Sequence, residues 1–282
     1  MTKKIAIALA FLVASACAFA AVPLENHVFV VVEENHSYAS LVGNGSMPYL
    51  NSLIKRYGLE TQYYADTHPS IGNYFMMTAG RVITNNDSFS STVYADNIVR
   101  HLVSAGRSWK SYAESLPFTG YTGGDVYPYA RHHNPFSYFS DVVNNSTQRT
   151  NLVPFTHFAS DLAGGRLPRY SFIVPNKLHD AHDGSLATAD AWLKTHIAPL
   201  ISSSTFQNGG LLVIVFDESY MSDGAHGGGH VAAVVIGPKV KAGYRSPDFY
   251  QHQNLLRLTM ESLGVTSYPG AAAGAADMHD VF

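Results

Sequence analysis

Four short segments of the chain are almost entirely apolar and rich in β-branched residues. Runs of this kind are typical of strands that are buried on both faces of a parallel sheet. They cover residues 27–32, 170–174, 211–216 and 231–236.

Six other segments carry apolar residues at helical spacing, and several of them are followed by glycine, which commonly ends a helix. Strands that alternate with helices indicate an α/β sandwich with a mostly parallel sheet. Residues 117–151 are aromatic, rich in Gly and Asn and without a clear period, so we expect an irregular insertion or lid at one end of the sheet. The predicted helices cover residues 47–57, 70–79, 94–105, 155–162, 185–201 and 247–263.

The first twenty residues are predicted to be a secretory signal peptide. Two lysines precede an apolar run, and Ala18-Phe19-Ala20 has the small residues of a cleavage site. A lipid anchor at Cys17 is the alternative, although Ala14 stands where the anchor motif usually has Leu. No internal repeat or linker divides the rest of the chain. We therefore expect a single domain over residues 21–282 that is exported to the periplasm or secreted, with no membrane span.

Composition narrows the class of function. The chain has 282 residues, 46% of them hydrophobic and 14% charged, which excludes a disordered, coiled-coil or collagen-like protein. With 18 Lys and Arg against 21 Asp and Glu, it lacks the basic excess of a nucleic-acid binder. A single Cys beside 14 His rules out a Cys-ligated zinc site, so any metal must bind to carboxylates and imidazoles.

Polar residues follow three of the predicted strands directly. They are Glu33-Glu34-Asn35-His36 after the first strand, Asn176 with His179-Asp180-Ala181-His182-Asp183 after the second, and Asp217-Glu218 after the third. Open α/β sheets bind ligands beyond the carboxyl ends of their strands, where these groups converge. Carboxylate and amide oxygens at this density suit a divalent cation. The alternative is that each acidic residue only caps the helix that follows it.

Ser70 stands where the 70–79 helix is expected to begin, after His68 and Pro69. It is either a simple helix cap or a nucleophile, because a helix N-terminus stabilises negative charge on a nearby oxygen. A serine in that place beside a metal can attack phosphorus. The chain contains no Gly-x-Ser-x-Gly, His-Glu-x-x-His, P-loop or Gly-x-Gly-x-x-Gly motif.

An ordered series of motifs resembles the phosphoesterase family, which contains acid phosphatases and phospholipases C. It spans residues 27–282, and the likeness is greater to the shorter acid-phosphatase branch. The resemblance implies a three-layer sandwich like that of alkaline phosphatase. The motifs are VFVVVEENHSY, HPSIGNY, TAG, RHHNPFSYF, LPRYSFIVPN, HDAHD, VIVFDES, GHVAAVVIGPKVKAG, HQNLLRLTMESLG and MHDVF.

The resemblance also implies roles for individual residues. Ser70 would be the nucleophile and would also contact the metal. Three histidines would face the phosphate, and one of them, His133 or His182, would protonate the leaving alcohol. Position 218 is Glu where some relatives have Asp. The implied metal ligands are Glu34, Asn35, Ser70, Asp217 and Glu218, and the implied phosphate-facing residues are His132, His133 and His182; His226, His230 and His252 are weaker candidates.

The leading interpretation is a metal-dependent acid phosphatase that hydrolyses small phosphate monoesters through a phosphoserine on Ser70. Protonated histidines would help to hold the anion, which predicts an acid pH optimum. A phospholipase C-like phosphodiesterase, with residues 118–139 contacting lipid, is the close alternative. A non-catalytic binding protein on the same fold is a third, against which the full set Glu34, Asn35, Ser70 and Asp217 argues. Mg, Ca, Mn, Zn and Fe all remain candidate metals.

Overall fold

The computed structural model describes residues 21–282. The predicted signal peptide and Cys17 therefore lie outside the described residues. Within residues 21–282, no helix combines the length and the apolar character that crossing a membrane requires.

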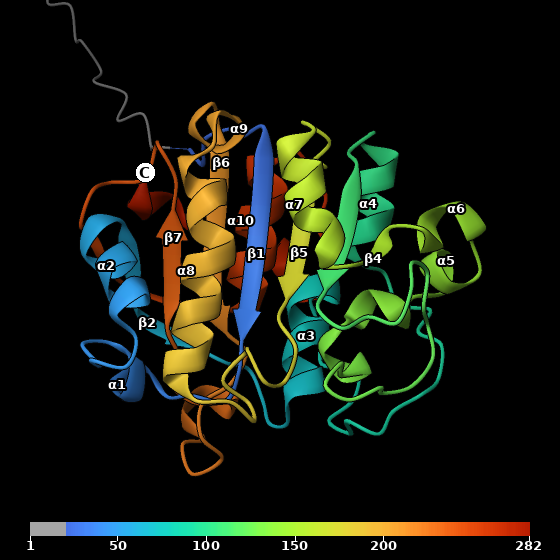
Figure 1. Cartoon of the computed structure of the whole chain (residues 1–282), viewed down its shortest axis with the longest axis horizontal. Coiled ribbons are helices and arrows are strands. Elements are labelled where there is room, and N and C mark those ends of the chain that lie inside the picture. The colour runs from blue at the N-terminus through green and yellow to red at the C-terminus, as the bar shows by residue number, and fades with distance from the viewer. Residues whose placement is uncertain (1–20) are drawn as a thin grey trace, which may run out of the picture.

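One eight-stranded sheet runs through the middle of the protein (Figure 1). Neighbouring strands are parallel except at β7, which is antiparallel to both β6 and β2. The prediction of a mostly parallel sheet is confirmed. Across the sheet the order is β4 (Leu152–Pro154), β3 (Trp109–Ala113), β5 (Tyr170–Val174), β1 (His27–Glu33), β6 (Gly210–Phe216), β7 (Ala233–Ile236), β2 (Gly58–Tyr64) and β8 (Arg245–Gln251).

The central position of β1 explains its apolar sequence. It pairs in parallel with β5 on one side and with β6 on the other, from His27 opposite Gly210 to Glu33 opposite Phe216. Residues Val28 to Val32 are all buried, because helices cover both faces of the sheet at this strand. Alternation of apolar and polar residues is therefore absent, as expected for a strand without a solvent face.

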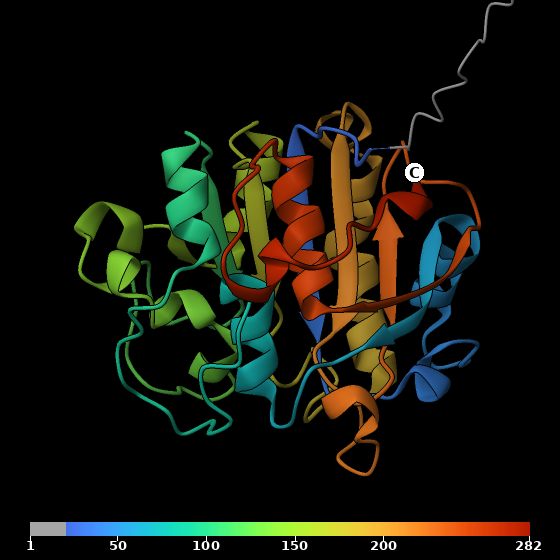
Figure 2. The same ribbon diagram turned by 180° about the vertical axis from the view of Figure 1, so that it is seen from behind.

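Helices form the two outer layers, and Figures 1 and 2 show them from opposite sides. The three-layer sandwich that the resemblance implied is confirmed. One face carries α2 (Pro48–Arg56), α7 (Thr156–Ala163), α8 (Leu186–Ser202) and α9 (Ser204–Gln207), and the other carries α3 (Ser70–Ala79), α4 (Ile98–Ser104) and α10 (His252–Ser262).

The remaining elements are short. The predicted insertion, residues 117–151, contains only brief helical turns between irregular loops, and it lies beside the β3–β4 end of the sheet (Figure 1). The short elements are α1 (Tyr38–Leu41), η1 (Arg131–His133), η2 (Pro135–Ser137), α5 (Ser140–Val143), α6 (Ser146–Arg149), η3 (Ala225–Gly227), η4 (Gly270–Ala273) and η5 (His279–Val281).

The predicted ends of helices are confirmed where a capping residue or a glycine marks them. Helix α3 spans the predicted residues 70–79 and ends at Gly80, whose φ of 65° lies in the left-handed region that ends many helices. A Cβ at Gly80 would lie 2.2 Å from the Pro269 carbonyl oxygen, so this position requires glycine on two counts. Helix α8 begins after Ser185, whose side chain accepts a hydrogen bond from the Thr188 amide.

Other predictions were wrong at the sheet edges. Residues 247–251 were predicted to be helical, but they belong to β8, an edge strand whose exposed positions make its pattern ambiguous. Strands β2, β3 and β4 were not predicted, because polar residues interrupt the first two and the third has only three residues. Helix α4 begins at Ile98 rather than at residue 94, since the Asn97 side chain caps the Val99 amide.

Candidate active site

The carboxyl ends of β1 and β6 bring the predicted residues Asn35 and Asp217 together. These strands are neighbours in register, and the Asp217 amide donates to the Glu33 carbonyl at 2.9 Å. The Asn35 amide in turn donates to Asp217 Oδ1 at 3.1 Å. Asn35 has a φ of 54°, a conformation that Asn tolerates better than most residues. The structure thus shows a backbone role for Asn35, while its side chain as a metal ligand stays a prediction.

Ser70 lies at the first position of α3 and is 3% exposed. Its hydroxyl is 3.1 Å from Glu34 Oε2 and 3.3 Å from Glu218 Oε1. Asn73 holds the preceding turn, since its Oδ1 accepts from the amides of Asp66 and Thr67. The fold therefore places the predicted nucleophile between two predicted metal ligands.

The loop after β5 adds Asp180 and His182 to this group. The Asp180 carbonyl accepts from the Glu34 amide at 2.8 Å, and Asp180 Oδ1 accepts from the His182 amide at 2.9 Å. Between them Ala181 has a φ of 74°, a left-handed conformation that costs free energy for a residue with a Cβ. The surrounding contacts hold this turn, so that Asp180 and His182 both face the end of β1.

His133 enters the group from the insertion. It is 1% exposed, with Nε2 3.3 Å from Glu34 Oε1 and Nδ1 3.5 Å from Asp180 Oδ2. Its ring stacks on that of Tyr74, with 5.1 Å between centroids and 7° between planes. The Tyr74 hydroxyl donates to Glu34 Oε1. The structure places His133 against Glu34, and its predicted contact with the phosphate stays a prediction.

This group fits a divalent cation. One ligand atom each from Glu34, His133 and His182 lies within 4.8 Å of the others. Three buried atoms nearby, Asp217 Oδ2, Asp180 Oδ2 and His133 Nε2, have no hydrogen-bond partner among the described residues. Buried polar atoms without partners are costly, and a cation held by mixed oxygen and nitrogen ligands would satisfy them. Cation binding by Glu34, Ser70, Asp217 and Glu218 together stays a prediction.

The charge state of the site supports the same conclusion. Burial raises the pKa of Glu34 and of Asp180 well above its ordinary value, and the nearby Asp217 charge raises both further. Burial also raises the pKa of Asp217 to about 6 and of Glu218 to about 9. Among the described residues, no Lys or Arg forms an ion pair with any of these four acids. Their ionised forms need a positive charge, which a cation would supply.

Burial lowers the pKa of His133 well below its ordinary value, and the neighbouring His132 and His182 lower it further. A neutral imidazole keeps a lone pair on one nitrogen, which is the form that binds metals. His132 packs edge-on against His133 and has Nδ1 3.6 Å from Asp125 Oδ2. His132 therefore lies beside the group, at its outer side.

Two histidines contact predicted ligands of the site, His68 at Glu218 and His252 at Asp217. His68 Nδ1 lies 2.8 Å from Glu218 Oε2, and its Nε2 lies 3.0 Å from the Asp223 carbonyl. Buried His252 has Nε2 2.6 Å from the Asp217 carbonyl and Nδ1 3.2 Å from the Tyr63 hydroxyl. Burial lowers the pKa of His252 to about 4, so a neutral ring can donate to Asp217 and accept from Tyr63. His252 thus orients the backbone of a predicted ligand.

The other two weak candidates lie apart. His230 stacks between Tyr38 and Tyr64, and His226 packs against Tyr64 and Phe249. Neither belongs to the group of Glu34, His133 and His182 that can hold a metal.

Sequence reasoning did not single out three residues that contact the site. Asp180 lay in the quoted HDAHD motif, but nothing there distinguished it from its polar neighbours. Tyr74 matches an ordinary core position of α3, and His68 was considered only for its place before Pro69. A signal was present for Tyr74, since it follows Ser70 by one helical turn and shares its face.

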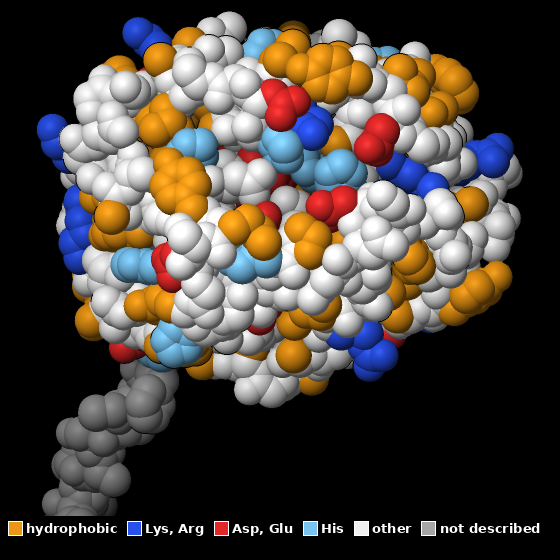
Figure 3. Space-filling view, turned by 90° about the horizontal axis from the view of Figure 1, so that it is seen from below, with side chains coloured by type: hydrophobic (Ala, Val, Ile, Leu, Met, Phe, Trp, Pro, Cys, Tyr) orange, Lys and Arg blue, Asp and Glu red, His pale blue; other side chains and the backbone are white. Residues whose placement is uncertain are grey.

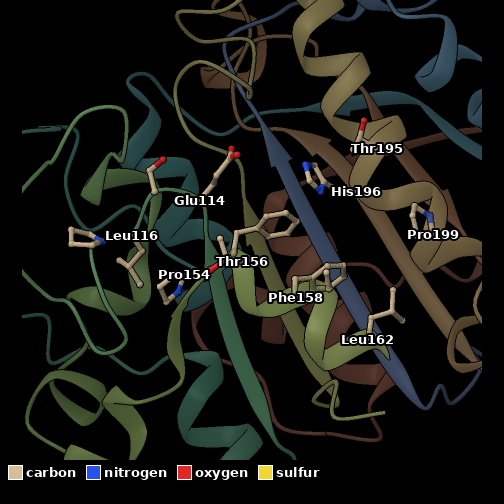
Figure 4. A pocket seen from close by; sticks show the side chains of 13 residues that line it. Glu114, Leu116, Pro154, Thr156, Phe158, Leu162, Thr195, His196 and Pro199 are labelled. Atoms are coloured by element: carbon tan, nitrogen blue, oxygen red, sulfur yellow. The ribbon is translucent and has the colours of Figure 1, made fainter. Parts of the chain in front are cut away.

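Seen from below, the edge of the sheet where the parallel strands end carries carboxylate and histidine side chains close together (Figure 3). A different hollow, with a volume of about 510 Å³, lies between α7 and α8 (Figure 4). Its walls include Phe155, Phe158 and Leu162, with Glu114 at one end. An apolar cavity with a carboxylate does not suit a phosphate, so this hollow is not the reaction centre.

Comparisons with known proteins show what this chain is similar to. Residues 44–266 match the model of the Phosphoesterase family. The chain is 34% identical to a phosphatidylinositol-3-phosphatase of Mycobacterium tuberculosis over 267 residues, which is 94% of this chain and 85% of that protein. It is 32% identical to an acid phosphatase of Aspergillus fumigatus over 255 residues, 86% of this chain but only 56% of the fungal protein.

Solved structures show the same fold at low sequence identity. A protein of the alkaline phosphatase superfamily from Vibrio parahaemolyticus matches with a TM-score of 0.60 at 13% identity, over 92% of this chain and 72% of the other. The lipoteichoic acid synthase of Listeria monocytogenes matches with a TM-score of 0.63 at 11% identity, over 88% and 74% of the two chains.

Proposed function

The chain belongs to the phosphoesterase family, whose members hydrolyse phosphoester bonds, and we propose that it is a metal-dependent acid phosphatase acting on phosphate monoesters. The observation that carries this proposal is the position of the Ser70 hydroxyl. It lies between Glu34 and Glu218 at the start of α3, next to the group of Glu34, His133 and His182. Relatives named as phosphatases support the choice of substrate bond.

Ser70 is the proposed nucleophile. Its Oγ forms a bond to phosphorus while the bond from phosphorus to the leaving alcohol breaks, which leaves a phosphoserine. The serine proton passes to Glu34 or Glu218, the two carboxylates in contact with Oγ. Water then cleaves the phosphoserine, which releases phosphate and restores the hydroxyl. The first amides of α3 favour negative charge near Oγ throughout.

The cation is proposed to bind to Glu34 and His133, with Asp180 and Asp217 supplying further oxygens, while His182 at the more exposed side of the same group is left to face the phosphate. A divalent cation in that place would offset the charge of the acids and polarise a phosphoryl oxygen. Asn35, Ser70 and Glu218 remain proposed ligands from the family resemblance.

A histidine is proposed to protonate the leaving alcohol. His133 and His182 were the candidates from sequence, and their burial separates them. His133 is enclosed, whereas the His182 side chain is 26% exposed and has Nδ1 2.7 Å from Asp183 Oδ1. A proton donor must exchange protons with water, so we assign this role to His182 and expect an acid optimum.

Hydrolysis of p-nitrophenyl phosphate and of bis-p-nitrophenyl phosphate by wild type and Ser70→Ala, with and without chelator, tests these assignments. The proposal expects monoester turnover that is lost in the variant and on chelation. Ser171→Ala, a buried serine on β5, is the matched control and should retain activity. Turnover that survives Ser70→Ala refutes the nucleophile, and a preference for the diester favours the phosphodiesterase alternative.

The proposal extends to the whole mature chain. We propose that residues 21–282 form one catalytic domain, since a single sheet is built from strands between residues 27 and 251. Export to the periplasm or secretion is proposed from the signal peptide alone. N-terminal sequencing of the protein recovered from the periplasm or the culture medium tests both the export and the cleavage after Ala20 or Ala21.

A further inference from the structure

Tyr74 connects the nucleophile's helix to both sides of the candidate cation group. It follows Ser70 by one turn of α3, so the two side chains lie on the same face of the helix. The Tyr74 hydroxyl donates to Glu34 Oε1, while Ser70 contacts Oε2 of the same carboxylate. Each oxygen of Glu34 is thus held by a different residue of α3.

The ring of Tyr74 has a second contact. It stacks almost parallel to His133, at 5.1 Å and 7°, and its other neighbour is Phe172 at 6.2 Å in an edge-on arrangement. Both Tyr74 and Phe172 are fully buried. The Tyr74 ring therefore packs between Phe172 of the sheet and the His133 imidazole, and this packing limits the orientations of His133.

We propose that Tyr74 is a positioning residue that sets the placement of Glu34 relative to His133, and that it thereby raises the affinity of the site for a divalent cation. This inference rests on the proposed metal dependence. Groups that hydrogen-bond to metal ligands fix the orientation of those ligands, and their loss typically lowers metal affinity by about 10- to 100-fold. The Tyr74 hydroxyl does this for Glu34, and the Tyr74 ring does it for His133.

Core packing alone does not account for the hydroxyl. A phenylalanine would fill the same space and make the same stack, but it would leave Glu34 Oε1 without its donor. Tyr112 provides a comparison, because its hydroxyl donates to buried Asp161 Oδ2 at 2.9 Å. Asp161 also pairs with Lys110 at 2.6 Å and with Arg166 at 3.4 Å, whereas the side-chain contacts of Glu34 are Ser70, Tyr74 and His133. Two cations thus hold Asp161 in place without the Tyr112 phenol, while among the described residues no Lys or Arg pairs with Glu34.

The test is Mn²⁺ affinity, measured from the electron paramagnetic resonance signal of the free ion, for wild type, Tyr74→Phe and Tyr112→Phe. Tyr112→Phe is the matched control, because it removes a hydrogen bond of the same kind at a distant carboxylate. We expect Tyr74→Phe to bind Mn²⁺ at least about tenfold more weakly than wild type. We expect Tyr112→Phe to bind within about twofold of wild type, since it leaves Glu34 and His133 untouched.

Each outcome has a distinct meaning. If wild type and Tyr74→Phe bind Mn²⁺ equally, the positioning role is refuted while the proposed function stands. If wild type binds none of Mn²⁺, Zn²⁺, Mg²⁺, Ca²⁺ and Fe²⁺ in isothermal titration calorimetry, the metal dependence is refuted, and the inference with it. If Tyr74→Phe does not fold, as judged by circular dichroism, Tyr74→Met replaces it, because the flexible Met side chain fills a core gap without a hydroxyl. The same weakening is then expected.

Discussion

Glu60 offers a test of the structure far from the candidate active site. It lies near the start of β2, fully buried, opposite Ala233 and Ser246, and neither carboxylate oxygen has a hydrogen-bond partner among the described residues. Burial raises its pKa to about 8, and the charge of Asp280 contributes to the rise. The folded protein therefore keeps Glu60 protonated across a range of pH in which the unfolded chain ionises it.

The sign and size of the effect follow from linkage. Because the pKa is raised on folding, the stabilising contribution is complete below the ordinary value of about 4.5 and is lost as pH rises through about 8. A shift from 4.5 to about 8 corresponds to at most about 5 kcal/mol, at about 1.4 kcal/mol per pH unit. Glu60→Gln carries no titrating group, so this part of the pH dependence disappears in the variant.

Urea unfolding followed by tryptophan fluorescence at pH 5, 6.5 and 8 measures the effect. The useful quantity is the free energy of unfolding of Glu60→Gln minus that of wild type, because every other titrating group cancels. We expect this difference to rise by several kcal/mol from pH 5 to pH 8. Gln62→Glu, which adds a carboxylate at an exposed position of the same strand, should show no such trend. A difference that changes by less than about 1 kcal/mol would refute the buried, unpaired state of Glu60.

Three further predictions concern the site and its supports. Asp180→Asn should lower both the Mn²⁺ affinity and the kcat for p-nitrophenyl phosphate by at least about tenfold, because Asp180 orients His182 and lies against His133. Unchanged values of both would place Asp180 outside the site. Gly80→Ala should lower the free energy of unfolding by more than about 1 kcal/mol in urea titrations, since the left-handed φ and the Pro269 carbonyl both oppose a Cβ; Gly45→Ala, which meets no atom within 4 Å, is the control. Hydrolysis of p-nitrophenyl phosphate should be faster at acid than at alkaline pH if a protonated imidazole is required; a pH–rate profile that is flat into the alkaline range would exclude that role.

Local patterns predicted the centre of the fold better than its edges. The runs at β1, β5 and β6 are unambiguous because these strands are buried on both faces, and the residues after β1 and β6 then had to meet at one edge. At the sheet edge, β8 has exposed positions and a proline, so its pattern does not separate a strand from a helix. The antiparallel direction of β7 depends on the path of the chain, which no local pattern contains.

The same limit applies to the candidate site. Glu34 and Asp217 could be placed from sequence because each directly follows a buried strand. Asp180 could not, since its position depends on a left-handed turn at Ala181 within a longer loop. His133 comes from an insertion without periodicity, and its depth beside Tyr74 results from tertiary packing. The sequence thus predicted which edge of the sheet carries the site and which residue types gather there, while the contacts between individual side chains required the structure.

The position of β1 in the sheet has a consequence for how the chain folds. Its parallel partners β5 and β6 begin at residues 170 and 210, so an apolar strand made early in synthesis has no partner until most of the chain exists. Pairings between distant segments form slowly, because a long loop must close before the contacts form. Until then both edges of the apolar residues Val28–Val32 of β1 are open to other chains, which makes this run a site of aggregation. Refolding yield should therefore depend steeply on protein concentration, and β1 is the segment where self-association would begin.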